Sequence, residues 1–304
     1  MYHYHKIIMI VSNERKVIEL IKSVAIIGGD LRIVKLVGML EKENYNVSTY
    51  ALEKSSDITN KSSNIQECIN GADIVIGPLP LSSNGEYINT PFSDNKVTID
   101  ELLDNLEGKT FIAGSIKQEV YDKIEGRDIT ILDIIKREEL AVLNAISTAE
   151  GALQIAINET PKNLHGNNVL VLGFGRIGKV LSKMLDGIGA RVACEARKTT
   201  DLAWIKAYGY EPINLIELKE NLNKFDIIIN TIPFVVLDKE MLEEVKKDAL
   251  IIDLASNPGG VDRNAIKELG IKFNWALSLP GKVSPVTSAE FMKETLINMF
   301  KEIN

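Results

Sequence analysis

Three glycines at a fixed spacing form the strongest chemical signal in the sequence. Residues 173–178 read GFGRIG, directly after the apolar segment Val169–Leu172 and before a stretch with helical periodicity. In this strand–turn–helix context the first glycine permits a tight turn, the second admits a pyrophosphate, and the third lets the helix pack closely on the strand. The helix N-terminus then presents free N–H groups to the phosphates. The pattern predicts a dinucleotide site, and the alternative is a glycine-rich turn in a related domain that binds no nucleotide.

The end of the next predicted strand, Arg191–Ala196, indicates which dinucleotide binds. NAD enzymes usually carry an acidic residue there, which holds the ribose 2′-OH. We align this position with Ala196. The next three residues are Arg197, Lys198 and Thr199. Two cations and a hydroxyl without a carboxylate favour the 2′-phosphate of NADP. The alternative alignment puts the acidic position at Glu195 and predicts NAD. The two alignments exclude each other, because adjacent residues of a strand face opposite sides of the sheet.

Two polar segments follow other predicted strands of the same domain. Residues 230–233 read NTIP, and residues 253–260 read DLASNPGG. Ligands of open parallel sheets bind beyond the carboxyl ends of the strands, so we expect both loops to border the nicotinamide. For Asp253, capping of its own loop is the alternative. The predicted cofactor contacts are Gly173, Gly175, Arg176, Ile177, Arg197, Lys198, Thr199, Asn230, Thr231, Pro233, Asp253 and Ala255.

Short apolar strands that alternate with amphipathic helices predict an α/β protein with two doubly wound, Rossmann-like parallel-sheet domains and a cleft between them. The first set of strands is Val24–Gly28, Tyr45–Ala51, Ala72–Gly77, Thr110–Gly114 and Asp128–Leu132. The second set is Val169–Leu172, Arg191–Ala196, Asp226–Asn230, Leu250–Leu254 and Lys272–Ala276. Helices are expected at Leu31–Lys42, Glu138–Asn158 and Ser288–Lys301, and the last is a candidate to cross back onto the first domain.

These elements give the expected domain limits. Residues 1–22, which hold His3 and His5, form an N-terminal extension. Residues 23–147 form a substrate and catalytic domain, 148–285 an NADP-binding domain, and 286–304 the C-terminal helix. The extension holds only a short apolar run followed by charges, which does not fit a signal peptide.

Composition excludes several classes of protein. The chain has 304 residues, 45% of them hydrophobic, and a formal net charge of -7, which is unfavourable for non-specific nucleic-acid binding. No apolar window reaches the length that we expect of a membrane-spanning helix. The two cysteines, Cys68 and Cys194, make neither a disulfide framework nor a metal site. We therefore expect a cytoplasmic protein without a bound metal, and a homo-oligomer stays open.

Several segments together resemble the A-subunit family of the dipicolinate synthases of spore-forming bacteria. The similarity runs from Ser23 to the C-terminus, and residues 1–22 are the main departure. The matching segments are IGGD at 27–30, TAEG at 148–151, LGFGR at 172–176, NTIP at 230–233, DLASNPGG at 253–260 and LPGKV at 279–283.

The resemblance implies an NADP-dependent oxidation of a dihydrodipicolinate-type intermediate to dipicolinate, pyridine-2,6-dicarboxylate, during sporulation. It also implies a flavoprotein-like B-subunit as partner and a place in the mother-cell cytoplasm. One alternative is a shikimate-dehydrogenase-like or 2-hydroxyacid NADP oxidoreductase. Another, from a different class, is a non-catalytic NADP-binding assembly protein or a redox sensor.

Oxidation of a dihydropyridine yields an aromatic ring, so positioning should matter more than a strong base. Histidine is nearly excluded as an acid or base, because only His165 lies inside the predicted fold. This weighs against lactate- or malate-type enzymes. The candidate catalytic residues are Glu150 and Lys282, for which a solvated or domain-bridging role is the alternative. Candidates for binding the substrate carboxylates are Arg32, Ser82, Ser83, Ser115, Ser256 and Ser284.

Overall fold

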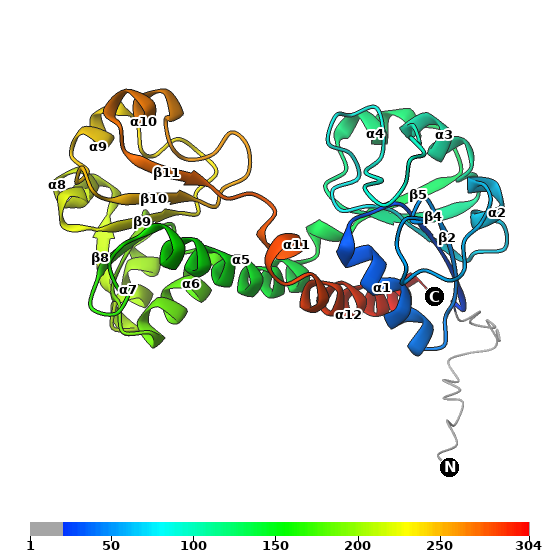
Figure 1. Cartoon of the computed structure of the whole chain (residues 1–304), viewed down its shortest axis with the longest axis horizontal. Helices are drawn as coiled ribbons and strands as arrows, with labels where there is room; N and C mark the ends of the chain where they lie inside the picture. The colour runs from blue at the N-terminus through cyan, green and yellow to red at the C-terminus, as the bar shows by residue number, and fades with distance from the viewer. Residues whose placement is uncertain (1–20, 304) are drawn as a thin grey trace, which may run out of the picture.

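Two parallel sheets, each covered by helices on both faces, make up the computed structural model, which describes residues 21–303 (Figure 1). The predicted fold class is therefore confirmed. Residues 1–20 of the predicted extension, with His3 and His5, lie outside the described residues.

The first sheet has the strand order β2-β1-β3-β4-β5, and all its neighbouring strands are parallel. Its strands are β1 (Ser23–Ile27), β2 (Asn46–Tyr50), β3 (Ile74–Ile76), β4 (Lys109–Ala113) and β5 (Ile129–Asp133). Its helices are α1 (Leu31–Lys42), α2 (Ile65–Ile69), α3 (Ile99–Asp104) and α4 (Gln118–Lys123), with a 3-10 turn at Ile134–Lys136. The strand order reverses between β1 and β3, which is where ligands bind in such sheets.

The second sheet has the order β11-β10-β9-β6-β7-β8 and reverses between β9 and β6. Its strands are β6 (Asn168–Leu172), β7 (Arg191–Ala196), β8 (Glu211–Asn214), β9 (Ile227–Asn230), β10 (Leu250–Asp253) and β11 (Lys272–Trp275). Its helices are α6 (Arg176–Gly187), α7 (Thr199–Ala207), α8 (Leu218–Asn221), α9 (Lys239–Glu243) and α10 (Arg263–Leu269), with 3-10 turns at Leu215–Glu217 and Leu222–Lys224. This is the strand order of dinucleotide-binding domains.

Strand β8 and helix α11 are among the elements for which the sequence analysis gave no range. Strand β8 lies at the sheet edge and contains Pro212, and a proline is tolerated there because an edge strand leaves N–H groups unpaired. The segment Leu279–Val283, expected to be a loop, forms the short helix α11 with Pro280 in its first turn. A polar edge strand and a five-residue helix lack the periodicity that reveals longer elements.

Helices α5 (Glu138–Glu159) and α12 (Pro285–Ile303) join the two domains (Figure 1). Leu140 of α5 packs in the first core, whereas Ala152 and Ala156 pack in the second. Helix α12 returns to the first domain, where Met292 and Leu296 are buried next to α1. The predicted crossing back is thus confirmed, and α12 begins at Pro285, three residues earlier than expected. The expected boundary at residues 147 and 148 falls inside α5, because this helix belongs to both cores.

Among residues 21–303, α5 is long and apolar enough to cross a membrane when only length and composition are considered, so the expectation that no apolar window reaches this length is wrong. Its alanines are packed against α6 and the second sheet, as in the core helix of a globular domain. This packing buries the side of α5 that carries Ala149, Ala152 and Ala156, whereas Val142 and Ile157 of the same helix are 43% and 61% exposed.

Candidate functional site

The turn between β6 and α6 has the geometry that the GFGRIG sequence predicts. Gly173 has a φ of +90°, in the region that favours glycine. A Cβ on Gly178 would lie 2.1 Å from the carbonyl oxygen of Gly173, so only glycine allows α6 to lie this close to β6. At Gly175 a Cβ would have no atom within 4 Å, so space is open above the turn. No side chain caps α6, which leaves its first N–H groups free to bind phosphates.

This turn lies where the strand order of the second sheet reverses. Thr231, the first residue after β9, fixes the two strands to each other at this point. Its N–H and its Oγ1 both donate to the carbonyl of Leu172, at 2.9 and 2.8 Å. The glycine turn and the loop after β9 therefore lie side by side at the carboxyl edge of the sheet.

The two alternatives for the acidic position at the end of β7 point to opposite faces. Ala196 packs in the core cluster that contains the α6 residues, and Glu195 points to the other face. Arg197, Lys198 and Thr199 are exposed, and α7 begins at Thr199 with no side-chain cap. Position 196 therefore has no carboxylate. The two cations Arg197 and Lys198 follow it, and then the uncapped N-terminus of α7.

Asn230 and Asp253 form a buried hydrogen-bonded pair beneath the loops after β9 and β10. The Nδ2 of Asn230 donates to Asp253 Oδ1 at 2.7 Å, and the side chains are 0% and 1% exposed. Asp253 also accepts from the N–H groups of Ala255 and Gly260, at 3.0 and 2.8 Å. The hydrogen bonds of this buried pair are all made within the protein, and they hold the loops after β9 and β10 in place. We therefore replace the predicted cofactor contact at these two residues with a positioning role, which for Asp253 is the capping alternative.

Four other predicted cofactor residues have different surroundings. Arg176, at the start of α6, forms an exposed ion pair with Glu138 at the start of α5, with an N–O distance of 3.2 Å. Ile177 is half-buried against the second core, and Pro233 is exposed. Ala255 is buried, and its carbonyl accepts from the indole N–H of Trp275 at 2.9 Å. Of these four, Arg176 and Pro233 have accessible side chains.

The predicted substrate ligand Arg32 is engaged within the protein. Its Nη2 lies 2.8 Å from Asp30 Oδ2 and also donates to the carbonyl of Leu79. Its side chain is only 10% exposed. A Cβ on Gly281 of α11 would lie 3.0 Å from the Arg32 Nε, so α11 covers this arginine from the side of the second domain. The structure thus contradicts a free carboxylate-binding role for Arg32, because its charge is paired and covered at the junction of the domains.

Glu150 and Lys282 lie on two helices that touch between the domains. A Cβ on Gly151 of α5 would be 3.0 Å from Leu279 Cδ1, at the start of α11. Glu150 precedes this contact and Lys282 follows it. Both side chains are exposed and have no ion pair or hydrogen bond within residues 21–303. They are available to a ligand that binds where α5 and α11 meet.

The five candidate serines fall into two groups. Ser82 donates to the carbonyl of Tyr87 at 2.5 Å, and Ser83 donates to Asn89 Oδ1 at 2.8 Å, so both shape the loop after β3. The hydroxyls of three others have no partner in the described chain. These are Ser115, Ser256 and Ser284, of which Ser284 Oγ is buried between α11 and α12. We therefore withdraw Ser82 and Ser83 as candidates and keep the other three.

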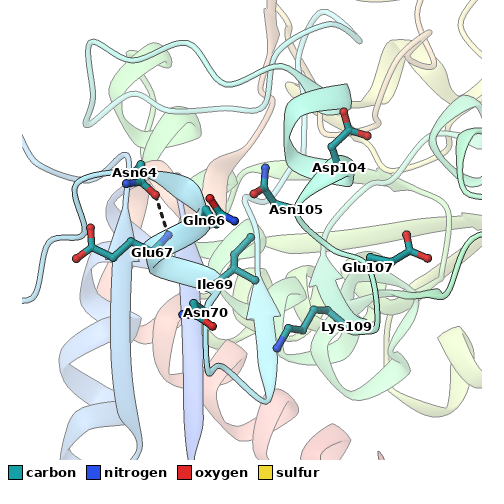
Figure 2. A pocket seen from close by; sticks show the side chains of 9 residues that line it. All are labelled: Asn64, Gln66, Glu67, Ile69, Asn70, Asp104, Asn105, Glu107 and Lys109. Carbon is teal, nitrogen blue, oxygen red and sulfur yellow. Dashed lines mark hydrogen bonds between the residues drawn. The ribbon is translucent and has the colours of Figure 1, made fainter.

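Two hollows in the surface lie away from these residues. One has a volume of about 580 Å³. Figure 2 shows its polar lining, which includes Asn64, Asn70 and Lys109. Lys109 begins β4, so this hollow lies at the amino ends of the first sheet. The other, of about 640 Å³, includes Asn168 and Arg191, the first residues of β6 and β7. Ligands of such sheets bind at the opposite, carboxyl edge, so neither hollow is a candidate active site.

Comparison with known proteins identifies the family. Residues 23–135 match the N-terminal domain of the dipicolinate synthase A-subunit. The chain is 31% identical over 285 residues to the dipicolinate synthase A-subunit of Bacillus subtilis (strain 168), which covers 92% of this chain and 96% of that protein. The chain belongs to the dipicolinate synthase A-subunit family.

Solved structures agree with this family membership. The dipicolinate synthase A-subunit from Bacillus halodurans superposes with a TM-score of 0.86 at 29% identity, over 92% of this chain and 97% of that one. The corresponding chain of the Bacillus subtilis enzyme gives 0.85 at 30% identity, over 93% and 96%. Residues 144–269 match the NAD-binding domain of D-isomer specific 2-hydroxyacid dehydrogenases. The second domain is therefore of the nicotinamide-nucleotide type, which supports an oxidoreductase role, and membership in this family implies a partner protein.

Sequence reasoning missed three features of this site. These are the unpaired carboxyl of Glu195, the contact of Gly281 with Arg32, and the exposed apolar side chains of Phe234 and Val235 after β9. A glutamate next to the apolar residues 192–194 of β7 was the one available signal. The other two depend on where loops from distant parts of the chain come to lie.

Proposed function

We propose that this chain oxidises a dihydrodipicolinate-type intermediate to dipicolinate with NADP, as the A-subunit of a two-component synthase that acts in sporulation. The proposal rests on one observation. This chain, a member of the dipicolinate synthase A-subunit family, has a glycine turn with open space for a pyrophosphate. The proposed partner is a flavoprotein-like B-subunit, and the proposed location is the mother-cell cytoplasm.

The residues present fit such a cofactor. The open space above Gly175 and the uncapped N-terminus of α6 would accept the pyrophosphate. Arg197, Lys198 and the N-terminus of α7 would hold the 2′-phosphate. NADP, when bound, supplies the hydride acceptor. The substrate ring would lie toward the first domain, where Lys282 and Ser284 would bind its carboxylates and Glu150 would take the released proton.

Removal of the two cations tests the choice of cofactor. Arg197→Ala with Lys198→Ala is expected to weaken NADP binding about 100-fold, since each charge-assisted bond to phosphate contributes about 1.5 kcal/mol. NAD affinity should stay within about twofold, because NAD has no 2′-phosphate. Titration calorimetry with both cofactors measures this. Lys206→Ala removes a charge from the other end of α7 and serves as the control. Equal losses for NADP and NAD, or a wild-type preference for NAD, would contradict the assignment.

Glu150→Gln tests the proton acceptor. We expect kcat to fall about 100-fold, the usual scale of general acid–base catalysis, with NADP affinity unchanged. Glu150→Asp keeps the carboxylate and should retain part of the rate. Steady-state rates of dipicolinate formation and calorimetric NADP binding give the two readouts. Full turnover by Glu150→Gln would remove this residue from the chemistry and leave a helix-surface role.

The reaction itself is tested with the purified chain, first without and then with the partner protein. The dihydropyridine dicarboxylate and NADP are supplied, and reduced nicotinamide and dipicolinate are quantified together. Equal amounts of both products are expected. Product formation only with the partner would assign the chain an assembly-dependent activity. If neither preparation forms dipicolinate, the proposed substrate is wrong.

A 2-hydroxyacid reaction is the second candidate, because the second domain matches the dehydrogenases that act on these acids. The position of His165 weighs against it. Its Nδ1 lies 3.1 Å from the carbonyl of Ile188, just before β7, at the amino end of the sheet. Within residues 21–303, His165 is the only histidine, and it lies at the wrong edge to act on a substrate at the nicotinamide.

A further inference from the structure

Glu195 is a buried carboxyl without a partner beside the glycine turn. Its side chain is 1% exposed, and neither carboxyl oxygen has a hydrogen bond in the described chain. The N–H of Gly173 lies nearby, but it donates to the main-chain carbonyl of Glu195 at 3.2 Å. Burial raises the pKa of the Glu195 carboxyl, and the Gly173 N–H and the charge of Arg197 oppose this only in part. An unpaired buried polar group destabilises a fold, so a ligand that pairs with it would explain its presence.

The alternation of β7 shows which way this carboxyl points. Cys194 packs in the core on the α6 side, whereas Ala193 packs in the core on the other side. Residues two apart on a strand share a face, so Glu195 lies on the face of Ala193. Its neighbours in register are Leu172 of β6 and Ile213 of β8. The carboxyl therefore lies at the carboxyl end of three strands, on the face opposite α6.

Exposed apolar side chains follow the two strands that lie on either side of the β6–β7 pair. Ile216, just after β8, is 90% exposed. Phe234 and Val235, just after β9, are 69% and 56% exposed. Strands β8 and β9 stand on either side of the β6–β7 pair, so both loops leave the same edge of the sheet. Apolar groups on two sides and a hydrogen-bond acceptor between them suit a flat ring that carries an N–H donor.

We propose that Glu195 accepts a hydrogen bond from the exocyclic amine of the cofactor's adenine, and that Ile216 and Phe234 contact the two faces of the ring. This inference rests on the proposed dinucleotide function and extends it to the base. Glu195 then determines specificity for adenine, while Arg197 and Lys198 read the 2′-phosphate. A base without the amine would leave the buried carboxyl unpaired, and sites of this kind discriminate strongly.

The test compares NADP with deamino-NADP, whose hypoxanthine base has a carbonyl in place of the amine. Calorimetry should show wild-type protein binding NADP at least about tenfold more tightly, the scale of one hydrogen bond to a carboxylate. Glu195→Leu should bind both cofactors equally and weakly, and its melting temperature without nucleotide should rise. Glu195→Gln can accept from the amine of adenine or, with its amide turned over, donate to the carbonyl of hypoxanthine, so it should lose most of the preference. Glu211→Gln, at the exposed amino end of β8, is the control and should behave as wild type.

The outcomes separate this inference from the proposed function. Equal affinity of the wild-type protein for NADP and deamino-NADP would overturn the inference and leave the NADP proposal standing. The same holds if Glu195→Leu keeps the wild-type preference. Absence of binding of any dinucleotide to the wild-type protein would overturn both. The comparison of the two cofactors on the wild-type protein decides the question even if Glu195→Leu does not fold.

Discussion

Gly178→Ala is expected to weaken dinucleotide binding severely. The new Cβ would lie 2.1 Å from the carbonyl oxygen of Gly173, and this atom belongs to the backbone and cannot rotate away. Helix α6 must therefore move off β6 and carry its N–H groups away from the phosphates. A displacement of this kind weakens binding about 100-fold or more. Overpacking also lowers the free energy of unfolding by about 1–3 kcal/mol. Titration calorimetry and thermal denaturation measure the two effects.

Two matched variants separate local packing from ligand binding. At Gly175 a Cβ has no atom within 4 Å, and its φ of -81° suits alanine, so Gly175→Ala should fold as wild type. It should still lose NADP affinity, because the Cβ would occupy the space of the pyrophosphate. Gly187→Ala, at the other end of α6, also meets no atom within 4 Å and should change neither property adversely. Wild-type NADP affinity in Gly175→Ala and Gly178→Ala would show that this turn is not the site.

Asp253→Ala is expected to lower the free energy of unfolding by about 3 kcal/mol, because it leaves three buried donors without an acceptor. These donors are one N–H of the Asn230 side-chain amide, whose nitrogen also donates to the carbonyl of Ile232, and the backbone N–H groups of Ala255 and Gly260. On a protein of this size the melting temperature should fall by roughly 6–12 °C. Since the same bonds shape the loops after β9 and β10, nucleotide affinity should also fall.

Asp262→Ala provides the comparison for this loss. Asp262 also accepts from two N–H groups, those of Asn264 and Ala265, but it does so as the N-cap of α10. Removal of such a cap costs about 1 kcal/mol. Thermal and urea denaturation of both variants compare the two carboxylates. Equal losses for Asp253→Ala and Asp262→Ala would mean that burial of the Asn230–Asp253 pair adds nothing to stability.

The alternation of apolar and polar residues was enough to predict most elements. The predicted limits of α1 and β7 match the structure, and the glycine turn lies between a strand and a helix as its sequence predicts. These features are local, because helix and strand periodicity and the steric freedom of glycine act over a few neighbouring residues. The place of Cys194 in the predicted strand Arg191–Ala196 likewise indicates a core residue. It is buried beside Ser182, and burial raises its pKa to about 12.

The hydrogen-bond and ion-pair partners of charged and polar side chains could not be predicted from the local sequence pattern. Arg32 was a plausible ligand for a substrate carboxylate until the fold placed the carbonyl of Leu79 and Gly281 of α11 against it. Asn230 and Asp253, at the ends of two strands, meet because β9 and β10 are neighbours in the sheet. Such contacts depend on the strand order and on loops that return from distant parts of the chain. Sequence periodicity contains no information on either.

The two α/β domains and the glycine turn could be predicted from the sequence alone, because each follows from residues close together in the chain. Which side chains remain free to bind a ligand depends on the folded structure. It covered Arg32, turned Asn230 and Asp253 inward, and left Glu150 and Lys282 exposed where α5 and α11 touch. The physical reason is that a polar group is available only when the protein supplies no partner for it, and that depends on the whole fold.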